Sequence, residues 1–157
     1  MRLPRIIRLD ESDTQVYETA AAPGEWAVLG SFVFWDDAPE TLAGKRQQAF
    51  SNGFLGVGSF GWSTLVEVVE ADDKNYDDVV RVLAAHLVEH YGAPDVETAA
   101  PAAREEVDYA ASICDHEPHT LLSVQREFSD EGIVESLRVV KPGAGDHSSV
   151  KIWSVEG

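Results

Sequence analysis

The sequence predicts an α+β protein, an antiparallel sheet with about three helices packed on one face. Three observations favour this class: short strand-like segments come first, amphipathic segments cluster in the middle, and a strand–turn–strand segment closes the chain. With 157 residues, the chain fits a single domain that buries its own core. We expect this domain to cover residues 1–142, and residues 143–157 to form a linker followed by an edge strand or a tail.

The first third of the chain predicts strands. Residues 5–9 and 14–17 are short segments on either side of a polar turn, so we expect them to pair with each other. A proline-glycine turn follows. Residues 26–35 are then expected to form one long strand, in which Gly30 makes a bulge or a bend.

Helices are expected in the middle of the chain. The first should begin at a capping residue, Asp36 or Asp37, and run to about residue 50. A strand is expected at residues 64–71. Two longer helices should then occupy residues 75–91 and 99–115, because their apolar residues recur at three- and four-residue steps.

The last third predicts a β-hairpin. Residues 120–128 and 133–140 are strand-like, and the polar residues between them end in Gly132, which is typical of a hairpin turn. Residues 142–145 are rich in glycine and proline and are expected to form a linker. Residues 150–155 should add an edge strand or form a tail.

The chain is strongly acidic, with 28 acidic against 12 basic side chains and a formal net charge of −16 at pH 7. This charge repels nucleic acid and anionic membrane surfaces, so we expect neither as a partner. The simplest interpretation is a solvated, soluble surface. The alternative interpretation is a face that docks a basic partner or collects cations.

Several features indicate a cytoplasmic protein. The longest apolar runs are too short to span a bilayer, and no apolar segment with a cleavage site follows the N-terminus. The single cysteine, Cys114, excludes an internal disulfide.

The segment from Ser51 to Thr64 combines four glycines with three aromatic side chains. Within it, the sequence G-V-G-S-F-G at Gly56 to Gly61 matches a dinucleotide-binding fingerprint. That fingerprint needs a strand before it and a helix after it, whereas here a helix precedes and a strand follows. We therefore expect no nucleotide site.

Two interpretations of this glycine-aromatic segment remain. It is a bent entry into a central strand with its rings in the core, or it is a binding surface in which glycines expose backbone and rings supply contact area. The second interpretation defines the candidate residues for binding a ligand or a partner: Phe54, Gly56, Gly58, Phe60, Gly61, Trp62 and the neighbouring Trp35.

Histidine and cysteine residues form a second candidate group. His86 and His90 are four residues apart, so they share one helix face, and Cys114, His116 and His119 follow as C-x-H-x-x-H. These residue types suit a transition metal, but their spacing matches no standard site, and Cys114 lies on an apolar helix stripe. We expect no cofactor, with a transition metal at these five residues as the alternative.

Three blocks of the sequence, residues 5–10, 23–28 and 54–70, resemble a small family of uncharacterised proteobacterial proteins. The resemblance extends over about residues 1–140 and implies no activity, cofactor or catalytic residue. Genes of that family occur near genes for molybdoenzyme maturation, so the resemblance implies an accessory role linked to that process.

The sequence therefore predicts a non-catalytic accessory protein that binds a protein partner or a second copy of itself. The reason is that no catalytic motif matches in sequence and also lies among the helices and strands that its chemistry requires. An edge-strand homodimer is one form of self-association. The alternative is an enzyme, or a small-ligand or metal-binding module, with a pocket near the glycine-aromatic segment or the histidine-cysteine group. Convergence of His86, His90, Cys114 and His116 in one cleft would favour this alternative.

Overall fold

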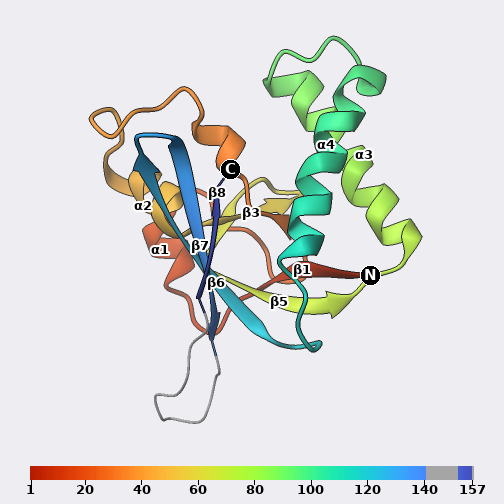
Figure 1. Ribbon diagram of the computed structural model, residues 1–157, viewed down its shortest axis with the longest axis horizontal. Helices are drawn as coiled ribbons and strands as arrows, with labels where there is room; N and C mark the ends of the chain where they lie inside the picture. Colours follow the sequence, from red (N-terminus) through yellow and green to blue (C-terminus); the bar gives the residue numbers. More distant parts are fainter. Residues whose placement is uncertain (141–151, 157) are drawn as a thin grey trace.

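The computed structural model describes residues 1–140 and 152–156. These residues form one antiparallel sheet with three main helices packed against it, which confirms the predicted α+β class (Figure 1). The strand order is β4-β3-β2-β1-β5-β6-β7-β8, so the N-terminal strand lies in the interior of the sheet. The strands are β1 (Arg2–Ile7), β2 (Trp26–Val28), β3 (Phe54–Val57), β4 (Trp62–Ser63), β5 (Leu65–Glu70), β6 (Leu121–Ser129), β7 (Gly132–Val140) and β8 (Ile152–Glu156).

The three main helices are α2 (Gly44–Asn52), α3 (Asp73–His90) and α4 (Val96–Ser112). Helices α3 and α4 pack against each other, with α4 against β1 and β2 and α3 against β3, whereas α2 packs against β6. In Figure 1, α3 and α4 lie together on one side of the view and α2 lies on the other. A single helical turn, α1 (Asp13–Val16), and a 3-10 helix, η1 (Ser31–Phe34), complete the fold.

Both long helices begin at side-chain caps. The Asp72 carboxylate accepts the backbone N–H of Asn75 at 2.8 Å, and the Asn75 side chain accepts the N–H of Asp72 at 3.0 Å. The Asp95 carboxylate accepts the N–H of Thr98 at 2.7 Å at the start of α4. Because of these caps and the apolar periodicity, the predicted bounds of both helices lie within a few residues of the observed ones.

Two strand predictions in the first third are wrong. Residues 13–16 form the helical turn α1, because the buried Asp13 carboxylate accepts the Thr64 hydroxyl at 2.8 Å and the Thr64 N–H at 3.2 Å. Strand β2 ends at Val28, because Gly30 is left-handed, with φ of +87°, and the chain continues as η1. A Cβ atom at Gly30 would lie 2.7 Å from the Cβ of Leu55, so the fold requires glycine there.

The first predicted helix begins later than expected, at Gly44 rather than near residue 37. Asp37 does not cap it, because its carboxylate pairs with the Arg46 guanidinium. Residues 38–41 form a turn instead, in which the Ala38 N–H donates to the Thr41 hydroxyl oxygen at 2.9 Å.

The C-terminal hairpin is confirmed as β6 and β7, which pair along their whole length. The predicted edge strand is found as β8, which pairs with β7. The predicted linker at residues 142–145 and the first two residues of the predicted edge strand lie outside the described residues. Among the helices that the structure describes, none is long and apolar enough to cross a membrane.

Candidate functional site

The glycine-aromatic segment folds as a tight hairpin between β3 and β4. Its turn is held by the carboxylate of Glu25, which accepts the Ser59 N–H at 2.6 Å and the Ser59 hydroxyl at 2.7 Å. Gly56 and Gly58 permit this approach, because a Cβ atom there would lie 3.1 Å and 2.8 Å from a Glu25 oxygen. The anion that this loop holds is therefore the protein's own carboxylate.

A strand, β4, follows Gly61 directly, so the expectation that no helix follows the glycines is confirmed. Gly61 is needed for packing, since a Cβ atom at that position would lie 2.7 Å from the carbonyl carbon of Ala20. Both observations support the exclusion of a dinucleotide site, which requires a helix N-terminus at the end of the loop.

The predicted binding residues of this segment divide by exposure. Phe54, Gly56 and Gly61 are buried, whereas Gly58, Phe60, Trp62 and Trp35 have solvent-accessible surface. The prediction of a binding surface therefore depends on the second group.

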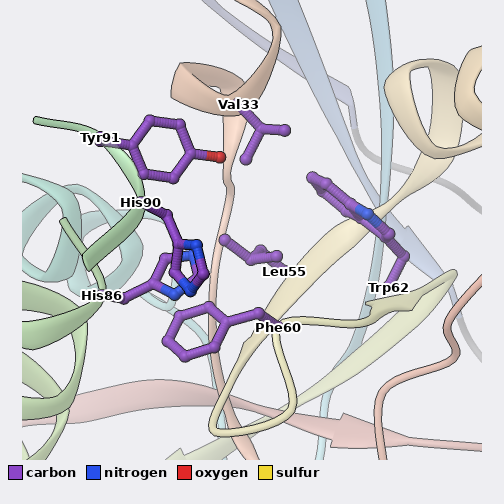
Figure 2. A pocket seen from close by; sticks show the side chains of 7 residues that line it. All are labelled: Val33, Leu55, Phe60, Trp62, His86, His90 and Tyr91. Carbon is purple, nitrogen blue, oxygen red and sulfur yellow. The ribbon is translucent and has the colours of Figure 1, made fainter.

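Phe60 and Trp62 line a pocket of about 350 Å³ together with both histidines of α3 (Figure 2). The rings of Phe60 and His86 stack in parallel, with centroids 3.5 Å apart and planes 4° apart. Burial, followed by the nearby charge of His90, lowers the pKa of His86, so its neutral form is favoured. We call this cavity the histidine pocket; its lining residues are Val33, Leu55, Phe60, Trp62, His86, His90 and Tyr91.

The structure does not bring the histidine-cysteine group together. Cys114 is buried in the core, where burial raises its thiol pKa to about 12. The imidazole of His119 lies on the surface, with Nδ1 2.9 Å from a Glu67 oxygen, and His116 lies in the same loop as His119. Within residues 1–140 and 152–156, no three histidine, cysteine, aspartate or glutamate side chains are placed to hold a metal ion.

A second cavity, of about 460 Å³, adjoins the histidine pocket and shares Val33 and Tyr91 with it. It lies between η1, the C-terminal end of α3 and the first three turns of α4. We call it the aromatic cleft; its lining residues are Phe32, Val33, Trp35, Asp36, Leu87, Tyr91, Gly92, Ala93, Thr98, Ala99, Ala102, Glu105 and Glu106.

Three aromatic rings form one wall of the aromatic cleft. Phe32 is buried and contacts Trp35 and Tyr91 edge-on, at centroid distances of 6.5 Å and 5.3 Å. The outer two rings remain open to solvent, since Trp35 is 70% exposed and Tyr91 is 45% exposed. Large rings exposed beside a concavity are typical of binding sites.

The charged residues that line the aromatic cleft are all acidic: Asp36, Glu105 and Glu106. Burial raises the pKa of Glu106 to about 7, and the neighbouring carboxylate of Glu135 adds to this effect. Arg126, behind Glu106, acts in the opposite direction, but it is already paired with Glu135.

Three lining residues of the aromatic cleft, Tyr91, Asp36 and Glu106, were not among the candidate site residues predicted from the sequence. The signal for Glu106 is its position: it lies seven residues after Ala99 and three after Ala103, which places it on the inward side of α4. A carboxylate at such a position is unusual and marks a candidate functional residue. Tyr91 and Asp36 carry no comparable signal, because only the tertiary fold brings the end of η1 beside the end of α3.

Together, the fold and the two cavities define an α+β protein that has one antiparallel sheet and an aromatic, acidic cleft where a 3-10 helix meets the two long helices. The chain belongs to the Family of unknown function (DUF6505), whose model matches residues 1–156. The predicted resemblance to a family of unknown function is thereby confirmed, while its proteobacterial origin stays a prediction. No curated protein and no solved structure matched the chain.

Proposed function

We propose that this protein is a cytoplasmic accessory protein that binds a basic segment of a partner protein in the aromatic cleft. The observation that carries the proposal is Trp35, a large ring that is 70% exposed at the rim of an apolar cavity with acidic residues. Tryptophan and tyrosine are enriched among the residues that dominate binding energies at protein interfaces. A cytoplasmic location is supported by the single cysteine, which is free and buried.

Charge favours a basic partner over a second copy of the chain. A formal net charge of −16 makes two copies repel each other, and the aromatic cleft adds three carboxylates with no lysine or arginine among its lining residues. A basic segment complements this charge and is attracted from a distance. The resemblance found in the sequence points to a partner in molybdoenzyme maturation, and that link is part of the proposal.

Site-specific photo-crosslinking tests the proposal. Trp35 is replaced by p-benzoylphenylalanine in the native cell, and the matched control carries the same group at Leu9, an apolar residue that is 61% exposed and outside the aromatic cleft. We expect one discrete adduct at position 35 that is absent at position 9, with a crosslinked peptide rich in lysine and arginine.

The identified partner is then purified, and its affinity is measured for the wild-type protein and for Trp35→Ala. We expect the substitution to weaken binding by about tenfold or more, as for central interface aromatics. An adduct of the protein with itself, or the same adducts at both positions, would contradict the proposal.

A further inference from the structure

We infer that the aromatic cleft recognises an arginine side chain of the partner, and that the carboxylate of Glu106 forms the ion pair with its guanidinium. This inference rests on the proposed function and adds the chemical group that is recognised. It is carried by the placement of an unpaired carboxylate beside an open aromatic wall.

The carboxylate of Glu106 has no hydrogen-bond partner among the residues that the structure describes. The nearby cation, Arg126, is occupied: its Nε donates to Glu135 at 2.9 Å, and its terminal nitrogens donate to the carbonyls of Phe50 at 2.7 Å and Leu29 at 2.8 Å. The Tyr109 hydroxyl is also occupied, because it donates to Glu135 at 3.0 Å. Neither of these two neighbours is therefore free to pair with Glu106.

The aromatic wall of the cleft that Glu106 also lines suits a guanidinium. Trp35 and Tyr91 offer exposed rings, and Phe32 supports both of them from behind. Guanidinium groups stack on aromatic rings, are weakly hydrated, and bind carboxylates through two parallel hydrogen bonds. An ammonium group is more strongly hydrated and loses more on entering a half-buried site, so arginine fits this cleft better than lysine does.

The surroundings of Glu106 make such binding sensitive to pH. Its own helix contributes Glu105 and Tyr109, β7 contributes Glu135, and β6 contributes Arg126. Asp36 and Tyr91 also line the aromatic cleft, and the charge of Arg46 acts on Tyr91. With its pKa raised to about 7 by burial, Glu106 is half protonated near neutral pH. A guanidinium favours the ionised form, so its binding releases a proton and strengthens as pH rises toward 8.

Small amides test this recognition directly. The isotope-labelled full chain is titrated with N-acetyl-arginine amide and with N-acetyl-citrulline amide, which has nearly the same shape but no charge. The Trp35 indole N–H, assigned by its loss in Trp35→Phe, reports binding by NMR. We expect saturable binding at pH 8 that is about tenfold tighter for the arginine amide, as for a charge-assisted pair, and that weakens as pH falls from 8 to 6.

Two variants test whether Glu106 causes the preference for the arginine amide over the citrulline amide. In Glu106→Gln, the arginine and citrulline amides should bind within about twofold of each other at every pH, because the carboxylate that pairs with the guanidinium is removed. Glu127→Gln changes the net charge equally at an exposed position outside the aromatic cleft and should retain the wild-type preference. If Glu106→Gln does not fold, the wild-type pH profile and the citrulline comparison decide the question without it. Equal affinity of the two amides, a flat pH profile, or the same loss in Glu127→Gln would overturn the inference.

These outcomes separate the inference from the proposed function. A preference for the arginine amide that Glu106→Gln removes, without any adduct at position 35, would support the recognition chemistry and reject the protein partner. A discrete basic partner at position 35, with no preference between the amides, would support the partner and reject Glu106 as its anchor.

Discussion

Arg126 and Glu135 face each other across β6 and β7 and form an ion pair, with Nε 2.9 Å from a carboxylate oxygen, although both side chains are almost fully buried. The same guanidinium donates to the carbonyl of Phe50 in α2 and to that of Leu29, just after β2. It therefore joins the C-terminal hairpin to two segments that are distant in the sequence. This pair is close enough to Glu106 for both of its charges to act on the pKa of that carboxyl group.

Removal of the Arg126 side chain should strongly destabilise the folded protein. We expect Arg126→Met to lower the free energy of unfolding by about 3–5 kcal/mol, because it leaves the buried Glu135 carboxylate without its cation and removes the donor to the carbonyls of Phe50 and Leu29. The double variant Arg126→Met/Glu135→Leu should recover much of this loss, since it buries no unpaired charge. Urea denaturation measures both. Arg138→Met, an exposed arginine on β7, is the control and should change stability by about 0.5 kcal/mol or less.

Glu25 should control the mobility of the hairpin between β3 and β4. Its carboxylate accepts hydrogen bonds from Ser59 and from the Ala22 N–H, so we expect Glu25→Ala to destabilise the protein by about 1–3 kcal/mol. The Ser59 amide should also exchange its hydrogen faster, while amides in α3 keep their protection. The exposed Glu18→Ala provides a control with the same charge change. Unchanged exchange at Ser59 would show that the turn holds without the carboxylate.

Local signals were sufficient for the later part of the fold. Helix α3 carries both an apolar stripe and a cap at Asp72, and the hairpin of β6 and β7 has its turn glycine at Gly132, so each element could be placed from its own residues. The early part of the fold depends on distant contacts. Residues 14–17 are strand-like in composition, yet the hydrogen bonds from Thr64 to Asp13 favour a helical turn at Asp13–Val16.

The candidate site was only partly predictable for the same reason. The rings of Phe60 and Trp62 and the pair His86 and His90 could each be selected from sequence, but their meeting in one pocket depends on the sheet order. Gly30 was expected to bend a long strand. In the structure it ends that strand, and the resulting turn into η1 carries Trp35 to the rim of the aromatic cleft.

The stacked pair Phe60 and His86 gives a prediction about pH. Burial is the main cause of the lowered pKa of His86, so Phe60→Ala, which uncovers the imidazole, should raise that pKa toward its ordinary value. Titration of the imidazole signals by NMR measures the change. Phe128→Ala removes a ring that stacks on Phe50 instead and should leave the pKa of His86 unchanged.

The same shift affects stability with a definite sign. A histidine whose pKa is lowered in the folded state binds a proton more readily when the chain is unfolded. His86 therefore reduces stability as pH falls through the ordinary histidine pKa, and this loss should be smaller in Phe60→Ala. A stability profile between pH 8 and pH 5 with the same slope in both proteins would contradict this assignment.

Truncation of Trp62 should cost far more stability than truncation of Trp35, although both were predicted as binding residues. The Trp62 ring packs so closely over Gly30 and Gly53 that a Cβ atom at these positions would lie 3.1 Å and 2.7 Å from it. Trp62→Ala should therefore destabilise the protein by about 3–5 kcal/mol through the cavity that it leaves. Trp35 is 70% exposed, so Trp35→Ala should change stability by about 0.5 kcal/mol or less. Urea denaturation distinguishes the two, and a large loss in Trp35→Ala would place that ring in the core. Because only Trp35→Ala is expected to leave the stability nearly unchanged, a loss of partner binding in that variant would report on the interface itself.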